Sequence, residues 1–200
     1  MFSQIKIEAE KWGIFFTSIM PGALGYKARL RLFRKYSGCP CLGMNIEQFV
    51  NVNGWSNISI GNRVNLGIGC QIESLHGTLK IGDNVSINNR VFLDANQSEI
   101  SIGDNCLIGP NVVIRASNHR FDKSPEILIR KQGHIGTPII IGEDVWIGAN
   151  VVITSGCIIG DNVVIGAGSV ITKNIPSGSI ATGVPARVIT TISERNNSIA

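Results

Sequence analysis

An isoleucine occupies every sixth position across much of the C-terminal half of the chain. From Ile141 the sequence reads IGEDVW, IGANVV, ITSGCI, IGDNVV, IGAGSV and ITKNIP without a slip, and shorter runs with this period begin at Ile60, Ile81 and Ile102. The residue two places before the next isoleucine is small or β-branched, so two alternate side chains of each short strand point inward. Because a strand this short cannot bury its own apolar face, the period predicts coils stacked about 4.8 Å apart around a column of Ile and Val. This architecture is a parallel β-helix.

The positions between the predicted strands hold residues that turn easily. Gly is followed by Asp-Asn, Pro-Asn or Glu-Asp, as in Gly82-Asp83-Asn84, Gly103-Asp104-Asn105 and Gly160-Asp161-Asn162. These residue types accept the left-handed backbone conformation that a sharp corner requires.

Composition excludes several classes of protein. The chain has 200 residues, 44% hydrophobic and 16% charged, which is too apolar for a disordered chain and too poor in charge for a coiled coil. This length suits one domain with a short appendage. Among the five cysteines only Cys39 and Cys41 are close in sequence, which offers neither a disulfide framework nor a four-ligand zinc site. We therefore expect a cytoplasmic protein without a bound metal.

The six-residue period breaks in two places, and insertions into a solenoid leave it on one face. Ile81 and Ile102 are 21 residues apart, which places a small excursion between Asn88 and Glu99. Ile114 and Ile141 are 27 residues apart, and residues 119–138 lose the period altogether. The second break predicts a loop that projects from the coils.

The chain contains three histidines, His76, His119 and His134. His119 stands where the ordered coil meets the larger excursion, which would hold its backbone rigidly and expose its ring. An imidazole can accept a proton at neutral pH, so His119 is the natural general base. For His76 and His134 we expect surface or structural positions.

Together, the repeats, the Asn118-His119-Arg120 run and the Gly183–Arg187 segment resemble the hexapeptide-repeat acyltransferases. The resemblance covers residues 102–119 and 137–189 and is greatest to the sugar and polysaccharide O-acetyltransferases, relatives of the galactoside, maltose and xenobiotic acetyltransferases. It implies a left-handed β-helix, although the general preference of parallel crossovers would predict the right-handed form. It also implies a homotrimer with each active site between neighbouring subunits.

The resemblance assigns the chemistry as well. His119 corresponds to the family's general base, which deprotonates an acceptor hydroxyl for attack on acetyl-CoA while a backbone N–H stabilises the oxyanion. No acyl-enzyme is needed, and Cys106 and Cys157 fall on inward positions of the repeat.

Binding residues follow by position. The implied cofactor contacts are Ala149, Ala167, Thr172, Lys173, Arg187 and Trp146, with Lys173 and Arg187 facing phosphates. Thr190 stands where some relatives carry a second arginine, and Trp146 is equally compatible with packing at a subunit contact. The implied acceptor contacts are Ser74 and either Asn88 or Asn89.

Basic residues are concentrated in the N-terminal arm, residues 1–45. Residues 1–40 hold seven Lys and Arg against two Glu, whereas residues 41–200 hold eleven against twelve acids. Tyr26, Leu30 and Phe33 lie at helical spacing beside a basic stripe, so residues 23–36 predict a basic amphipathic helix. This helix either caps the open end of the β-helix or contacts an anionic membrane surface, and the two roles are compatible. A secretory signal is disfavoured because Glu8 and Glu10 lie where a leader is cationic.

We thus expect an all-β left-handed parallel β-helix over residues 46–189, with a helical arm, one extruded loop and a polar tail at 190–200 that frays. The expected function is acetyl-CoA-dependent O-acetylation of a sugar hydroxyl in surface polysaccharide or lipopolysaccharide synthesis, in the cytoplasm or at the inner face of the membrane. The enzymatic alternatives are N-acetylation of a nucleotide-linked amino sugar and O-acetylation of a xenobiotic. A β-helical carbonic anhydrase is disfavoured because no two histidines have ligand spacing. The non-enzymatic alternative is a scaffold, and no feature points to nucleic acid.

Overall fold

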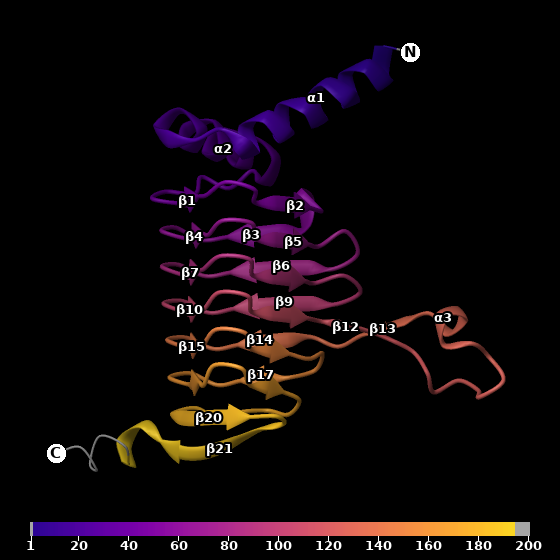
Figure 1. Cartoon of the computed structure of the whole chain (residues 1–200), viewed down its shortest axis with the longest axis vertical. Helices are drawn as coiled ribbons and strands as arrows, with labels where there is room; N and C mark the ends of the chain where they lie inside the picture. Colours follow the sequence, from indigo (N-terminus) through magenta and orange to yellow (C-terminus); the bar gives the residue numbers. More distant parts are fainter. Residues whose placement is uncertain (1, 195–200) are drawn as a thin grey trace.

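The computed structural model describes residues 2–194, with side chains from residue 11 onward, and shows a straight solenoid of stacked coils (Figure 1). Three sheets of eight, six and five strands form its sides, and all their strand pairs are parallel except the last pair of the eight-stranded sheet. Sheet A comprises β1 (Asn45–Ile46), β4 (Asn65–Leu66), β7 (Ser86–Ile87), β10 (Leu107–Ile108), β15 (Trp146–Ile147), β18 (Val164–Ile165), β20 (Ser179–Gly183) and β21 (Ala186–Thr191). Sheet B comprises β2 (Asn51–Asn53), β5 (Gln71–Glu73), β8 (Phe92–Asp94), β11 (Val113–Arg115), β16 (Val152–Ile153) and β19 (Val170–Ile171). Sheet C comprises β3 (Ile58–Ile60), β6 (Thr78–Ile81), β9 (Glu99–Ile102), β14 (Ile139–Ile141) and β17 (Ile158–Ile159).

The core is the predicted column of inward side chains. Equivalent residues of successive coils pair with one another, so that Ile60 pairs with Ile81, Ile81 with Ile102 and Ile141 with Ile159. The second inward position of each hexad is buried too, including Cys106 and Cys157. Inward residues of successive coils thus stack on one another, and the interior is apolar along most of its length, with the buried Ser169 as a polar exception.

Each residue of the Gly-Asp-Asn corner has a separate task. The asparagines adopt the left-handed conformation, with φ of 59° at Asn84 and 60° at Asn105. The aspartate caps the adjacent coil, as where Oδ1 of Asp104 accepts the N–H of Asp83 at 2.7 Å. A Cβ on Gly82 would collide with that same carboxylate oxygen, so the corner requires glycine there.

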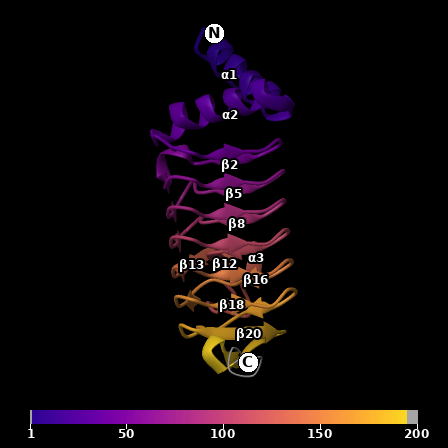
Figure 2. The same ribbon diagram turned by 90° about the vertical axis from the view of Figure 1, so that its left-hand side faces the viewer.

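Two helices close the N-terminal end of the solenoid. α1 (Phe2–Ile19) projects beyond it, and α2 (Gly22–Ser37) lies across the first coil, next to the short helix η1 (Trp55–Asn57), as Figures 1 and 2 show. The predicted helix at 23–36 is therefore present, with Phe33 buried against Trp55 at a ring separation of 5.0 Å. Capping of the open end, one of the two predicted roles, is confirmed.

The larger excursion is more ordered than a loop. Its stem is an antiparallel pair, β12 (Ser117–His119) with β13 (His134–Gly136), and α3 (Ile129–Gln132) lies near its tip. The predicted start at residue 119 is therefore two residues late, since the chain leaves the solenoid at Ser117. The smaller excursion is a turn at residues 95–98, inside the predicted range, and a matching turn at residues 74–77 was not predicted.

The C-terminal end is closed by β20 and β21, which pair antiparallel. β21 reaches Thr191, so the segment expected to be a tail begins as a strand. Residues 195–200 of that expected tail lie outside the described residues. No helix among residues 2–194 is long and apolar enough to cross a membrane.

Candidate active site

The predicted site residues fall on two different edges of the solenoid. The A/B corner comprises the turns between sheets A and B, at residues 67–69, 88–91, 109–111, 148–150 and 166–168. The B/C corner comprises the turns between sheets B and C, at residues 74–77, 95–98, 154–156 and 172–174, and the hairpin that carries His119. A single chain therefore does not bring His119 together with the predicted ligands at the A/B corner.

His119 lies directly opposite His134 on the hairpin stem. The two rings are both exposed, with centroids 4.3 Å apart. The N–H of Arg120 donates to the carbonyl of Gly133, and the N–H of Thr137 donates to the carbonyl of Ala116. Hydrogen-bonded pairs alternate along an antiparallel ladder, so the histidine pair occupies a position without direct backbone bonds, where side chains approach most closely. His134 lies at the surface, which is one of the two positions expected for it. The contact of its ring with the candidate base was not predicted.

The two imidazoles face the N-terminal coils. Side chains two residues apart on a strand share a face, so His134 lies on the same face as Gly136. A Cβ on Gly136 would collide with the backbone of Gln97 in the preceding coil. The face that carries both histidines is therefore the one turned toward the 95–98 turn.

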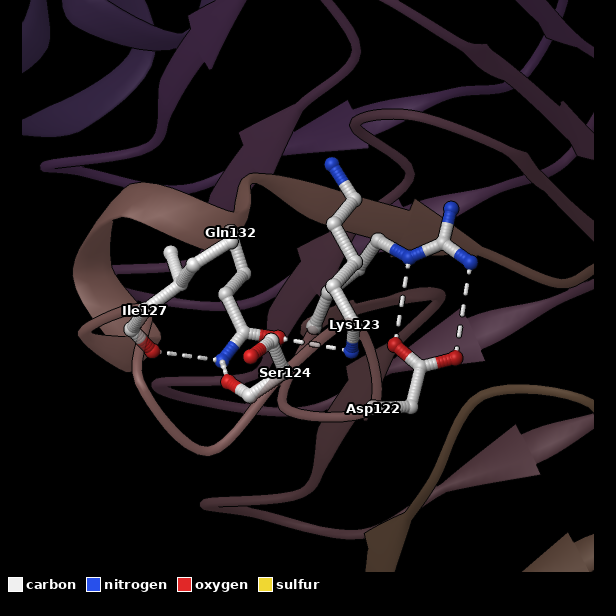
Figure 3. A network of polar contacts seen from close by, with 6 residues as sticks. Asp122, Lys123, Ser124, Ile127 and Gln132 are labelled. Carbon is white, nitrogen blue, oxygen red and sulfur yellow. Dashed lines mark hydrogen bonds and ion pairs between the residues drawn. The ribbon is translucent and has the colours of Figure 1, made fainter.

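Beyond the stem, a buried glutamine holds the hairpin in shape (Figure 3). The Oε1 of Gln132 accepts the N–H of Lys123 at 2.9 Å, and its Nε2 donates to the carbonyls of Ser124 and Ile127. Next to it Arg120 pairs with Asp122, and the hydrogen bond from Arg120 lowers the pKa of that carboxyl. Gln132 is only 2% exposed and has no signal in the sequence, because its burial depends on the fold of the hairpin.

At the A/B corner, two backbone donors are unused. No hydrogen bond among the described residues employs the N–H of Ala149 or Ala167. In the coils nearer the N-terminus the corresponding donors are capped, since Oδ1 of Asn89 accepts the N–H of Ile68 and Oδ1 of Asn88 accepts the N–H of Asn89. The C-terminal part of this corner can therefore donate to a ligand through its backbone, and the N-terminal part presents the two asparagines.

The chain is similar to proteins of one known family. A profile described as bacterial transferase hexapeptide (six repeats) matches residues 138–173, and one described as hexapeptide repeat of succinyl-transferase matches residues 99–116. A maltose O-acetyltransferase from Clostridium difficile 630 is 32% identical, over 92% of this chain and 85% of its own, with a TM-score of 0.63. The chain belongs to the hexapeptide-repeat acyltransferases.

Two further solved structures are similar to this chain. A galactoside acetyltransferase solved with coenzyme A is 31% identical, over 94% of this chain and 80% of its own, with a TM-score of 0.61. An AntD N-acyltransferase variant from Bacillus cereus, solved with dTDP and coenzyme A, is 26% identical over 78% of this chain and 87% of its own, with a TM-score of 0.65. A search of curated protein sequences found no match. The solenoid is thus the left-handed β-helix of this family.

The other positions implied by the hexapeptide-repeat resemblance lie apart from one another. Thr172 and Lys173 are exposed just after β19, whereas Arg187 is exposed on β21 opposite Thr182. Trp146 is 56% exposed on the outer face of sheet A and lies beside Leu107. The two cations therefore lie at the C-terminal end of the solenoid, where they can meet phosphates.

Ser74 requires a correction. It is fully buried, and its hydroxyl donates to the carbonyls of Asn53 and Gly54 in the preceding coil. The hydroxyl is committed to the 74–77 turn, so Ser74 is a structural residue and not an acceptor contact.

One polar row on sheet B was missed by the sequence analysis. Residues at the same register of four successive strands form a ladder on the outer face, Asn53, Glu73, Asp94 and Arg115. Asp94 is only 5% exposed and accepts from Nε of Arg115 at 3.0 Å. The ladder ends beside Ser117, at the root of the hairpin, where Nε of Arg115 donates to the hydroxyl of Ser117 at 3.4 Å. Its only sequence signal is a polar residue after the inward residue of each strand.

No cluster of three or more His, Cys, Asp or Glu side chains suited to a metal occurs in the part of the chain that the structure describes.

Proposed function

We propose that this acyltransferase is an acetyl-CoA-dependent O-acetyltransferase that modifies a sugar hydroxyl of a surface polysaccharide or its precursor. The observation that carries the proposal is His119, exposed on a rigid hairpin stem, in a chain similar to maltose and galactoside acetyltransferases. The reaction takes place in the cytoplasm, in keeping with five cysteines that are all unpaired.

In this proposal His119 acts as the general base. Its exposed ring accepts the proton of the acceptor hydroxyl as that oxygen attacks the acyl carbon. The stem pairing fixes the backbone of His119, and His134 limits the rotation of its ring by direct contact. A base held in one orientation loses less freedom in the transition state.

Acetyl-CoA supplies an activated thioester as the acetyl donor. The unused N–H groups of Ala149 and Ala167 fit such an extended ligand, because they can hydrogen-bond to amide groups along it. Lys173 and Arg187 would bind its phosphates, and Asn88 or Asn89 would orient the acceptor, the present contacts favouring neither asparagine.

Direct transfer is favoured over an acyl-enzyme. Cysteine acts as a nucleophile in its thiolate form. Burial raises the pKa of Cys106 to about 11 and also raises the pKa of Cys157, so both thiols are protonated at neutral pH. Both side chains lie inside the coil, out of reach of a donor.

The active site is assembled in a homotrimer. Its base lies at the B/C corner and its ligand donors at the A/B corner, so the two halves face one another only across two copies. The exposed Trp146 and Leu107 on sheet A are suited to such a contact.

The first test is acetyl transfer to a panel of sugar acceptors, with acetyl-CoA binding measured by calorimetry on the same samples. His119→Ala is expected to lower turnover by about 10²–10⁴-fold while binding of acetyl-CoA is retained. His134→Ala is expected to have a smaller effect. His76→Ala is expected to have none, because His76 is exposed in the 74–77 turn. Full turnover in His119→Ala contradicts the mechanism, and absence of acetyl-CoA binding by the folded wild type favours a scaffold.

The second candidate is N-acylation of a nucleotide-linked amino sugar. It is favoured by the similarity to the AntD N-acyltransferase solved with dTDP and coenzyme A. Paired acceptors that differ only in a hydroxyl or an amine at one carbon separate the two functions. Turnover of the amine alone would reverse the proposal.

A further inference from the structure

The outward face of α1 is aromatic. Trp12, Phe15 and Phe16 are each more than half exposed, with relative exposures of 57%, 52% and 53%. Their rings contact one another, with the Trp12 and Phe16 rings stacked at 5.8 Å. Three clustered aromatic side chains in water are costly, so this face is built for contact with another phase or molecule.

This exposure is not a consequence of a loosely attached helix. Ile14, Thr17 and Ser18 lie on the opposite side of α1 and are partly buried. The Nη1 of Arg29 donates to the carbonyls of Thr17 and Met20, and its Nε to that of Ile46 in the first coil. The end of α1 is thus fixed to α2 and to the solenoid, with its aromatic face turned outward.

The outward face of α2 is cationic. Gly25, Arg29 and Phe33 are buried one helical turn apart and mark the face that packs on α1 and the coils. The opposite face exposes Lys27, Arg31 and Arg34, together with Leu24 at 74% exposure. α2 contains no acidic residue, so no carboxylate of its own neutralises this row.

Both faces lie at the same end of the molecule (Figures 1 and 2). We propose that α1 and α2 form a docking surface for an anionic lipid bilayer. Aromatic rings enter the interface between headgroups and acyl chains, and lysine and arginine bind anionic headgroups beside them. A bilayer is favoured over an acidic protein as the partner, since an acidic protein would use the cations but leave the aromatic cluster exposed.

The inference is independent of the proposed acceptor and of the transfer chemistry. The surface lies at the N-terminal end of the solenoid, whereas His119 lies on the hairpin that leaves the fourth coil. Docking holds the long axis of the solenoid away from the bilayer and leaves the hairpin clear of it. A substrate attached to lipid would then be presented at a set distance from the membrane.

The test is co-sedimentation of the full chain with two kinds of vesicle, phosphatidylcholine alone and phosphatidylcholine with phosphatidylglycerol. We expect binding to the anionic vesicles that falls with added salt, and little binding to the neutral ones. The triple variant Lys27→Gln, Arg31→Gln, Arg34→Gln is expected to bind about a hundredfold more weakly. The variant Trp12→Ser, Phe15→Ser, Phe16→Ser is expected to lose binding while its circular dichroism spectrum keeps the β-helix signal.

Matched variants control for charge and exposure alone. Lys80→Gln, Arg90→Gln, Arg130→Gln removes the same charge from the flank and the hairpin, and Phe121→Ser removes a ring that is 76% exposed. Neither is expected to change vesicle binding. Equal recovery with both kinds of vesicle, or equal loss in the control variants, overturns the inference. Self-association abolished by the aromatic variant, without vesicle binding, would assign the face to a second copy.

Acetyl transfer to a water-soluble acceptor separates this inference from the proposed function. The surface variants are expected to retain that turnover. Vesicle binding without turnover would reject the proposed transferase and leave the docking surface. Turnover without vesicle binding would reject the docking surface and leave the proposed transferase.

Discussion

At the scale of single residues, burial decides the chemistry of the cysteines. Four of the five are buried, and desolvation raises the pKa of Cys41 to about 12 and of Cys106 to about 11. The pKa values of Cys70 and Cys157 are raised for the same reason. These thiols stay protonated in the folded protein at pH values where an unfolded chain would lose their protons.

This difference in pKa predicts that the folded protein is less stable at alkaline pH. A thiol whose pKa is raised on folding contributes its full stability below the unfolded pKa near 9 and loses it as pH rises toward the folded value. The free energy of unfolding in urea should therefore fall above about pH 9, by about 1.4 kcal/mol per pH unit for each such thiol.

Cys106→Val is the matched variant, because Val85 and Val145 occupy the same position in the coils on either side. It should reduce the pH slope without a large loss of stability at neutral pH. An unchanged slope would show that the raised pKa of Cys106 does not contribute to the fall in the free energy of unfolding at alkaline pH.

At the scale of elements, the corner turn is the unit that lets one coil follow another. Its glycine leaves room for the aspartate of the next coil, and its asparagine supplies the positive φ. The glycine is required by a contact with the next coil, whose Asp104 is hydrogen-bonded to Asp83, 21 residues earlier in the chain. A change at one corner therefore disturbs two coils.

Gly82→Ala is expected to destabilise the protein by about 1–3 kcal/mol, since the new Cβ forces the Asp104 carboxylate from the N–H of Asp83. The measurement is urea unfolding followed by circular dichroism. Gly13→Ala in α1 is the control, because nothing lies within 4 Å of its added Cβ and alanine favours a helix by about 1 kcal/mol. A loss of stability in Gly13→Ala as large as in Gly82→Ala would contradict this account of the corner.

At the scale of the whole molecule, the solenoid separates its functions along one axis. The N-terminal end carries the two helices, the middle carries the hairpin with His119, and the C-terminal end carries Lys173 and Arg187 (Figure 1). The two halves of the candidate site lie on different corners around that axis. A shared site in the proposed trimer reconciles these positions.

Mixing two inactive variants tests the shared site. His119→Ala removes the base, and Ala167→Tyr obstructs the A/B corner. If each site joins the hairpin of one copy to the corner of the next, an equal mixture reassembled from unfolded chains should regain roughly a quarter of wild-type activity, because one interface in four has both halves intact. No recovery from a mixture that forms hetero-oligomers would place the whole site within one chain.

The sequence by itself determined the β-helix, its inward residues, its corner chemistry and the break that carries His119. These depend on a pattern that repeats every six residues, and each coil contacts its neighbours in a way that the pattern already contains. The resemblance to the family followed from the same residues.

Only the tertiary structure decided the rest, because the rest depends on how segments without the period pack. The register of the hairpin placed His134 against His119, and the turn at residues 74–77 buried the hydroxyl of Ser74. The packing of Ile14 and Arg29 turned the aromatic side of α1 outward. None of these contacts recurs at a fixed spacing in the sequence, so the six-residue repeat could not predict them.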